Sequence, residues 1–121
     1  MNETFVFDTY ALIEILKKNP NYEKYMAATA ITNNFIFAEF CYNLYKDKVK
    51  NSNIYIAEIK PTIASLKPEL IEEAMQFRIK NRHKNLSMTD CISYIMAKRL
   101  GIKFLTGGKE FKNLENVEFV K

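Results

Sequence analysis

A short apolar run that stops at a carboxylate is the most constraining feature of this sequence. Phe5, Val6 and Phe7 are followed directly by Asp8, and a helical pattern of apolar residues begins at Ala11. An apolar run of this length is typical of a buried strand in a parallel sheet, so the sequence predicts a strand, a short loop and a helix. Asp8 would then lie at the carboxyl end of the strand, where open α/β sheets bind their ligands. A helix cap is the alternative interpretation, because Asp also satisfies the free N–H groups of a first helical turn.

The rest of the chain alternates between the helical period and short apolar runs. Helices are predicted at 21–29, from Asn33, at 51–60, from Pro68 and from Ser87 to a stop at Gly101. Strands are predicted at 30–32, 62–66, 102–105 and 117–120. In the helix after Asn33, the residues expected to face the core are Ala38, Cys41, Tyr42, Tyr45 and Val49. Alternating strands and helices imply a sheet covered on both faces, so the predicted fold is a three-layer α/β/α sandwich with a mainly parallel sheet.

Composition indicates an ordinary globular protein. The 121 residues are 48% hydrophobic and 26% charged, with only 3 Gly and 3 Pro, so one domain over residues 1–121 is expected. The segment 1–4 lacks the basic residues of a signal peptide, and no apolar run is long enough for a membrane span. A cytoplasmic protein without a membrane partner is therefore expected. Cys41 and Cys91 lack the spacing of a zinc site and are interpreted as reduced thiols.

Charge distribution is more informative than net charge. The excess of +4 permits nucleic-acid binding without requiring it. The end of the helix that begins at Pro68 carries a basic cluster, which consists of Arg78, Lys80, Arg82, His83 and Lys84. The cluster is a candidate track for a phosphate backbone. The alternative is that these cations simply complement the carboxyl end of the helix and are solvated there.

Two further acids occupy settings similar to that of Asp8. Glu39 lies in an early turn of the helix that Asn33 caps, and Asp90 comes three residues after Ser87 in a capping sequence. The helix dipole is a sufficient structural reason for Glu39, and both interpretations stay open for it. If all three acids lie at one edge of the sheet, they repel one another unless a cation lies among them. Carboxylate oxygens are the ligands that Mg²⁺ takes, so the sequence predicts a divalent-cation site.

Four parts of the sequence together resemble a known family: Asp8 with Thr9, Glu39, residues 85–91 and residues 104–111. Their order and spacing are similar to those of the PIN domain family, most of all its VapC-type toxins. The resemblance implies a compact α/β/α sandwich and a ribonuclease that depends on Mg²⁺ or Mn²⁺. It also implies a small antitoxin protein as partner and, often, a homodimer. Asp8, Glu39 and Asp90 fall on the acidic catalytic and metal-binding positions of the family.

The sequence departs from the family pattern at Gly108, where the family generally has an aspartate. Thr106 and Glu110 remain on either side of this position, and Glu110 is the acid that would substitute. Thr9 and Thr106 are expected to position waters or carboxylates. Glycine at this position is expected to affect the occupancy of a second metal position and the catalytic rate, but not the fold. A catalytically weakened, PIN-like interaction module is therefore an alternative function.

The predicted reaction is hydrolysis of an RNA phosphodiester bond by water activated on a metal ion held mainly by Asp8 and Asp90, with help from Glu39. The residues expected to bind the RNA backbone are Arg78, Lys80, Arg82 and Lys84. A phosphoacceptor signalling domain is a further alternative, because it too has an aspartate at a strand end. Such a domain normally has paired acids after its first strand, whereas here Glu3 precedes that strand.

Overall fold

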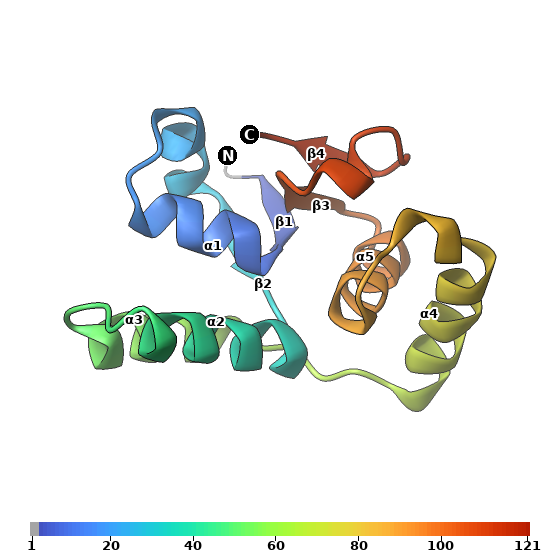
Figure 1. Ribbon diagram of the computed structural model, residues 1–121, viewed down its shortest axis with the longest axis horizontal. Helices are drawn as coiled ribbons and strands as arrows, with labels where there is room; N and C mark the ends of the chain where they lie inside the picture. Colours follow the sequence, from blue (N-terminus) through green and yellow to red (C-terminus); the bar gives the residue numbers. More distant parts are fainter. Residues whose placement is uncertain (1–2) are drawn as a thin grey trace.

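Four short parallel strands form the centre of the fold in the computed structural model, which describes residues 3–121 (Figure 1). They are β1 (Thr4–Phe7), β2 (Thr29–Ile31), β3 (Lys103–Thr106) and β4 (Val117–Phe119). The strand order is β2-β1-β3-β4 and each neighbouring pair is parallel. Strand β1 is therefore interior, with Val6 opposite Ile31 on one side and Phe104 on the other. The parallel sheet predicted from the sequence is confirmed, and of the segment 1–4 only Met1 and Asn2 lie outside the described residues.

Helices cover both faces of this sheet. The α-helices are α1 (Thr9–Leu16), α2 (Asn34–Lys46), α3 (Ser52–Ile59), α4 (Pro68–Lys80) and α5 (Met88–Leu100). The 3-10 helices are η1 (Pro20–Ala27), η2 (Lys60–Thr62), η3 (Arg82–Lys84) and η4 (Lys109–Phe111). Figure 1 shows α1 on one side of the sheet and α4 and α5 on the other, which confirms the α/β/α layers. Each helix within residues 3–121 is too short or too polar to cross a bilayer.

Helix α5 is the most deeply buried helix of the described chain, because residues 91–97 are all buried. A helix that is apolar on all sides must be covered on all sides, and α5 packs against β1, β3 and α4. Its first turn forms the capping box predicted at Ser87 and Asp90. Its end is Gly101, whose φ of 71° is the left-handed conformation that glycine adopts at little cost. These caps fix where Asp90 stands relative to the sheet.

Helix α2 turns a different face to the core from the one that the sequence predicts. The buried residues of this helix are Ile36, Phe40 and Leu44. Of the residues predicted to be buried, Ala38, Tyr42 and Tyr45 are exposed, and Cys41 and Val49 are only partly buried. Both sets repeat at helical spacing, so the period does not choose between them. The buried set contains purely apolar side chains, whereas a buried tyrosine must find a partner for its hydroxyl group.

The segment between α3 and α4 is the other place where the structure differs from the prediction made from the sequence. The helix predicted at 51–60 is confirmed as α3, but the strand predicted at 62–66 is wrong, because this segment contributes only a single bridge between Ile63 and Thr32. Thr62 belongs to η2, where its hydroxyl group donates to the carbonyl oxygen of Ile59 at 2.6 Å. Pro68 then starts α4, and residues 63–67 between the two helices are extended but pair with the sheet only at that bridge. The helix predicted at 21–29 is present as the 3-10 helix η1.

Candidate functional site

Asp8 stands at the carboxyl end of the interior strand β1. Its backbone N–H continues the sheet ladder by donating to the carbonyl oxygen of Leu105 at 3.0 Å, and its own carbonyl oxygen accepts from Leu12 at 3.1 Å. By position Asp8 is the N-cap of α1, but its side chain makes no capping hydrogen bond. The residue is only 7% exposed. Helix capping therefore does not account for this buried carboxylate.

Thr106, the last residue of β3, holds one oxygen of Asp8. The Thr106 hydroxyl group donates to Asp8 Oδ2 at 2.6 Å, and it accepts from the backbone N–H of Gly108 at 3.0 Å. Because the Gly108 N–H occupies the acceptor side, the hydroxyl proton is directed to Asp8. Thr106 is fully buried, and Asp8 is almost fully buried. The two neighbouring strands thus fix the orientation of the Asp8 carboxylate.

Glu39 and Asp90 reach the same region from two other helices. Glu39 of α2 is held by Thr9, whose hydroxyl group donates to Glu39 Oε1 at 2.9 Å. Asp90 accepts from the backbone N–H of Ser87 through Oδ2 at 3.0 Å, and its own N–H donates to Ser87 Oγ at 3.0 Å. Within residues 3–121, Asp90 Oδ1 has no hydrogen-bond partner. Asp90 is therefore a helix-capping residue that keeps one oxygen for another role.

The three acids line one pocket of about 410 Å³ between α1 and α2. The other residues that line it are Thr9, Tyr10, Ile13 and Glu14 of α1, Asn43 of α2, and the residues that follow the two helices, Lys17 and Asp47. Sequence reasoning named Thr9 but missed the others, although Asn43 and Asp47 follow Glu39 at steps of four residues and so share its helix face. Among the ion pairs of the described residues, none involves Asp8, Glu39 or Asp90. Lys17, the basic residue that lines the pocket, pairs with Glu14 at 3.8 Å, so none of the three acids has a basic partner within ion-pair distance.

The buried carboxylates are harder to ionise than acids in water. Burial raises the pKa of Asp8 from 3.8 to about 7, and repulsion from Asp90 and Glu39 adds to the rise, while the hydrogen bond from Thr106 opposes it. Burial also raises the pKa of Asp90, with the hydrogen bonds from Ser87 opposing and repulsion from Glu39 and Glu110 adding. The repulsion arises because the three acids line the same pocket. Binding a cation would remove this cost.

The donor set has the chemistry of a Mg²⁺ or Mn²⁺ site, since it offers carboxylate oxygens and no nitrogen or sulfur ligand. Within residues 3–121, no three His, Cys, Asp or Glu side chains are arranged so that they could hold a metal ion as they stand. Mg²⁺ keeps several of its waters and usually binds proteins through one or two carboxylates. Asp8, Asp90 and Glu39 each use one carboxylate oxygen in these hydrogen bonds, so each keeps its other oxygen for a ligand. The residues present therefore fit a partly hydrated ion.

The two glycines after β3 differ in what they permit. A side chain at Gly107 would collide with the Tyr10 ring and with the carbonyl oxygen of Val120, so glycine is required there. Gly108 has a φ of −67°, which any residue adopts. A Cβ atom at Gly108 would lie 3.5 Å from Thr106 Oγ1 and 3.5 Å from Glu110 Oε2, which is ordinary contact. An aspartate at position 108 is therefore compatible with this backbone.

The basic cluster after α4 lies apart from the acid pocket. Arg78 Nε donates to the carbonyl oxygen of Leu86 at 3.1 Å, and Arg82 donates to that of Ile79 at 3.1 Å. Both side chains line a separate pocket of about 200 Å³. The Arg82 contact fits the helix-end interpretation, because Ile79 lies in the last turn of α4, whereas Arg78 ties α4 to the loop before α5. Lys80 is exposed and Lys84 partly buried, and contact of the cluster with RNA stays a prediction.

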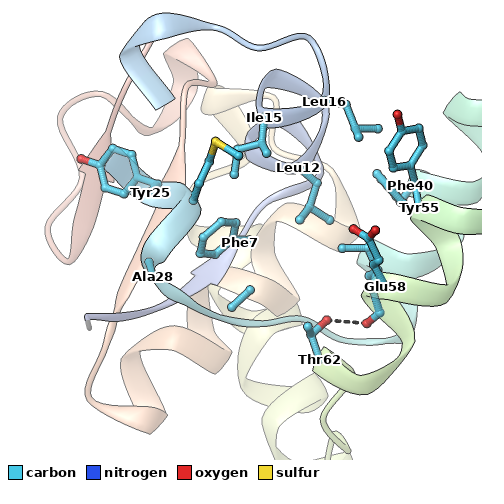
Figure 2. Close-up of a pocket in the computed structure, with 13 residues that line it drawn as sticks. Phe7, Leu12, Ile15, Leu16, Tyr25, Ala28, Phe40, Tyr55, Glu58 and Thr62 are labelled. Atoms are coloured by element: carbon cyan, nitrogen blue, oxygen red, sulfur yellow. Dashed lines mark hydrogen bonds between the residues drawn. The ribbon is translucent and has the colours of Figure 1, made fainter. Parts of the chain in front are cut away.

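A second, mostly apolar pocket of about 370 Å³ lies across α1 from the acids. Leu12, Ile15 and Leu16 of α1 line it, whereas the other face of the same helix lines the acid pocket. Figure 2 shows Tyr25 of η1 at one side and Tyr55 of α3 at the other, with Phe7 and Leu12 between them. The rim carries Glu58, and Thr62 closes one end. Helix α1 thus separates a polar pocket from an apolar one.

These features define an α/β protein with an acidic pocket at the carboxyl edge of a parallel sheet. The family model of the PIN domain matches residues 5–117, and the chain belongs to the PIN domain family. The resemblance seen in the sequence is thereby confirmed. A search of curated proteins finds no match to the chain.

Solved structures with a similar fold include three proteins from microbes. VapC20 of Mycobacterium tuberculosis, a sarcin-ricin loop cleaving toxin, is 17% identical, with a TM-score of 0.78 over 98% of this chain and 100% of its own. A toxin-antitoxin complex from Klebsiella pneumoniae contains a chain that is 16% identical, with a TM-score of 0.76 over 94% of this chain and 95% of its own. PAE2754 from Pyrobaculum aerophilum is 14% identical, with a TM-score of 0.71 over 98% of this chain and 89% of its own. At these identities the comparison establishes a shared fold.

Proposed function

We propose that this PIN domain is a metal-dependent endoribonuclease, a hydrolase of the VapC-like toxin type. One observation carries the proposal: Asp8 is buried at the end of an interior strand, in a pocket with Glu39 and Asp90, and has no basic partner among the described residues. A buried carboxylate without a compensating cation costs stability. A purely structural role would not require that cost, whereas a cation site does.

The roles of the residues follow from their hydrogen bonds. Asp8 and Asp90 would hold the ion, because each already uses Oδ2 and has its other oxygen for a ligand. Glu39, oriented by Thr9, would assist from α2. Thr106 keeps the Asp8 carboxylate turned towards the pocket. When bound, Mg²⁺ or Mn²⁺ supplies a water of lowered pKa and neutralises charge that develops on the phosphate.

RNA is the substrate class that we propose. Membership of the PIN family and the fold shared with VapC20, which is described as a sarcin-ricin loop cleaving toxin, support this choice. The exposed Lys80 and the partly buried Lys84, with Arg78 and Arg82, would add backbone affinity and little sequence preference.

The test is cleavage of a mixed RNA pool, with and without Mg²⁺, by the parent protein and by Asp8→Asn. We expect cleavage only by the parent and only with the metal ion. Asp47→Asn is the matched control, because this exposed acid lines the same pocket and its replacement changes the net charge equally. Equal cleavage by the parent and Asp8→Asn, or no cleavage by the parent, would refute the proposal.

A non-catalytic interaction module of the same family is the second candidate, and Gly108 is the observation that favours it. Calorimetric titration with Mn²⁺ separates the two candidates. Heat of binding that disappears in Asp8→Asn supports the enzyme. An absence of binding to the parent at millimolar Mn²⁺ supports the module.

For the protein partner, we propose a small antitoxin whose amphipathic helix fills the apolar pocket beside α1. The fold shared with a chain of the Klebsiella pneumoniae toxin-antitoxin complex supports this class of partner. An Arg or Lys of the antitoxin would enter the acid pocket and replace the cation through a charge-assisted pair. Co-purification from the native host followed by mass spectrometry identifies the partner. Ile15→Lys, on the apolar side of α1, should then release it while Mn²⁺ binding persists.

A further inference from the structure

The acid pocket has one wall that is not acidic. Tyr10 and Ile13 line the pocket from α1, one helical turn apart, so their side chains share a face of that helix. Within residues 3–121, Tyr10 is the only aromatic residue that lines this pocket. A hydrated cation gains nothing from an apolar wall, because its ligands are oxygen atoms. The wall therefore indicates a second kind of contact in the pocket.

The Tyr10 ring is held in place by packing. A Cβ atom at Gly107 would collide with Tyr10 Cε1 and would lie 2.6 Å from Tyr10 Cζ, so the ring occupies the space that a side chain at position 107 would need. The ring also lies beside that of Tyr22, with the ring centroids 6.3 Å apart and the ring planes tilted by 46°. Tyr10 is nevertheless partly exposed where it lines the pocket. A ring that is already positioned lowers the entropy cost of binding a ligand against it.

The hydroxyl group of Tyr10 takes no part in holding the fold together. Its neighbour Tyr22 donates to the carbonyl oxygen of Val120 at 2.6 Å, and Tyr25 donates to Glu118 Oε2 at 2.5 Å. Within residues 3–121, the Tyr10 hydroxyl group has no such partner. Packing against Gly107 and Tyr22 fixes one side of the ring, and the side that lines the pocket is left for a ligand.

The charge of the pocket limits what this wall can bind. The acids repel a phosphate group until a cation is present, and Lys17, the basic residue of the lining, already pairs with Glu14. A nucleobase is uncharged and has a planar face, so it can stack on a tyrosine ring beside these acids without that repulsion. Stacking of this kind requires a base that is not paired within a helix. The pocket volume of about 410 Å³ lies within the range of pockets that hold small ligands.

We propose that Tyr10 is a stacking platform for an unpaired nucleobase next to the phosphate that the acid pocket cleaves. This proposal rests on the proposed function and adds a residue that binds the substrate without touching the cation. It divides the affinity for RNA between two parts of the site, because the acids bind the phosphate through the ion and Tyr10 binds the base. Removing the ring should therefore weaken RNA binding and leave cation binding unchanged.

The test is the affinity for a labelled pool of single-stranded RNA of fixed length, measured by fluorescence polarisation with Ca²⁺ in place of Mg²⁺ to suppress cleavage. Tyr10→Leu should weaken binding about tenfold, the size expected for the loss of one stacked base. Tyr10→Phe keeps the ring and should bind as the parent does. Tyr45→Leu is the matched control, because this exposed tyrosine of α2 does not line the acid pocket. An abasic sugar-phosphate chain of the same length should bind equally to the parent and to Tyr10→Leu.

A tryptophan at position 10 reports stacking directly, because the chain contains no tryptophan of its own. The fluorescence of Tyr10→Trp should be quenched by the RNA pool and not by the abasic chain. Tyr45→Trp should respond to neither. Equal quenching of the two variants by the RNA pool would contradict stacking at Tyr10.

Calorimetric titration with Mn²⁺ separates stacking from a structural role of the ring. Tyr10→Leu that binds Mn²⁺ as the parent does but loses RNA affinity supports the proposal. If Tyr10→Leu loses Mn²⁺ affinity as well, the ring supports the pocket and the proposal is refuted. If Tyr10→Leu binds RNA as tightly as Tyr45→Leu while cleavage by the parent still requires Asp8, stacking is refuted and the proposed function stands. If the parent neither binds nor cleaves the RNA pool, both proposals fall.

Discussion

Replacing Asp8 by Asn should make the metal-free protein more stable, and increasingly so as the pH rises. The folded-state pKa of Asp8 is about 7 and the ordinary value is 3.8. Between these values the folded protein holds a proton that the unfolded chain has released, so unfolding becomes easier as pH increases. The penalty is absent below pH 3.8 and is complete above about pH 7. Asn removes the titration, and its amide oxygen still accepts from Thr106.

The size of the effect follows from the displacement of the Asp8 pKa. The interval from 3.8 to about 7 corresponds to roughly 4 kcal/mol, which is an upper limit for the penalty on the free energy of unfolding. Urea unfolding in the presence of a chelator measures that free energy at pH 4.5 and at pH 8. We expect the free energy of unfolding of Asp8→Asn to exceed that of the parent by more at pH 8 than at pH 4.5. Asp47→Asn removes an exposed acid from the same pocket, and its free energy of unfolding should change with pH as that of the parent does.

Mn²⁺ should reduce the advantage of Asp8→Asn over the parent at pH 8. An ion that binds only the folded protein adds about 2.7 kcal/mol at a hundredfold excess over its dissociation constant, and this gain belongs to the parent. Profiles of the parent and Asp8→Asn that stay parallel from pH 4.5 to pH 8 would refute the assignment of the raised pKa to Asp8. An equal gain from Mn²⁺ in both proteins would refute its role as a ligand.

Three further predictions concern the surroundings of the pocket. Gly107→Ala should destabilise the protein by at least about 1 kcal/mol, because its side chain would collide with its neighbours, whereas Gly108→Ala should change stability by less than about 0.5 kcal/mol. Urea unfolding of the two variants measures this difference. Ser87→Ala should cost about 1 kcal/mol because α5 loses its cap, yet it should leave the Mn²⁺ response in place, as thermal melting with and without Mn²⁺ will show. Tyr42 and Tyr45 are exposed along one face of α2, and we expect a second copy of the chain to pack against this face in a homodimer. Tyr42→Lys should therefore shift the homodimer to monomers in light scattering, and an unchanged mass would contradict this interface.

Sequence reasoning succeeded where a local signal has one physical meaning. The run that ends at Asp8 and the capping sequence from Ser87 to Asp90 each determine an element boundary through short-range chemistry. Gly101 likewise ends α5 because its conformation suits glycine. Parallel topology then brings the strand end and the helix starts to one edge, so the location of the acid pocket follows from a few residues.

Sequence reasoning failed where the signal has two meanings. Helix α2 has apolar or aromatic residues on more than one face, and only the packing of α1 and α3 against it selects Phe40 over Tyr42. The pocket residues Asn43 and Asp47 were missed for the opposite reason, because polar residues on a helix carry no local sign of what faces them. Their spacing from Glu39 becomes informative once the neighbour of α2 is known.

The hydrogen bond between Thr106 and Asp8 joins residues 98 positions apart, and this separation matters while the chain is being made. Strand β1 leaves the ribosome well before β3, its neighbour on one side, which begins only at Lys103. Asp90 and Thr106 also arrive late, so a growing chain carries Asp8 without the groups that orient it. Contacts between residues that are far apart in the sequence form late in folding during synthesis. A chain that stops before Thr106 therefore lacks the hydrogen bond that orients Asp8.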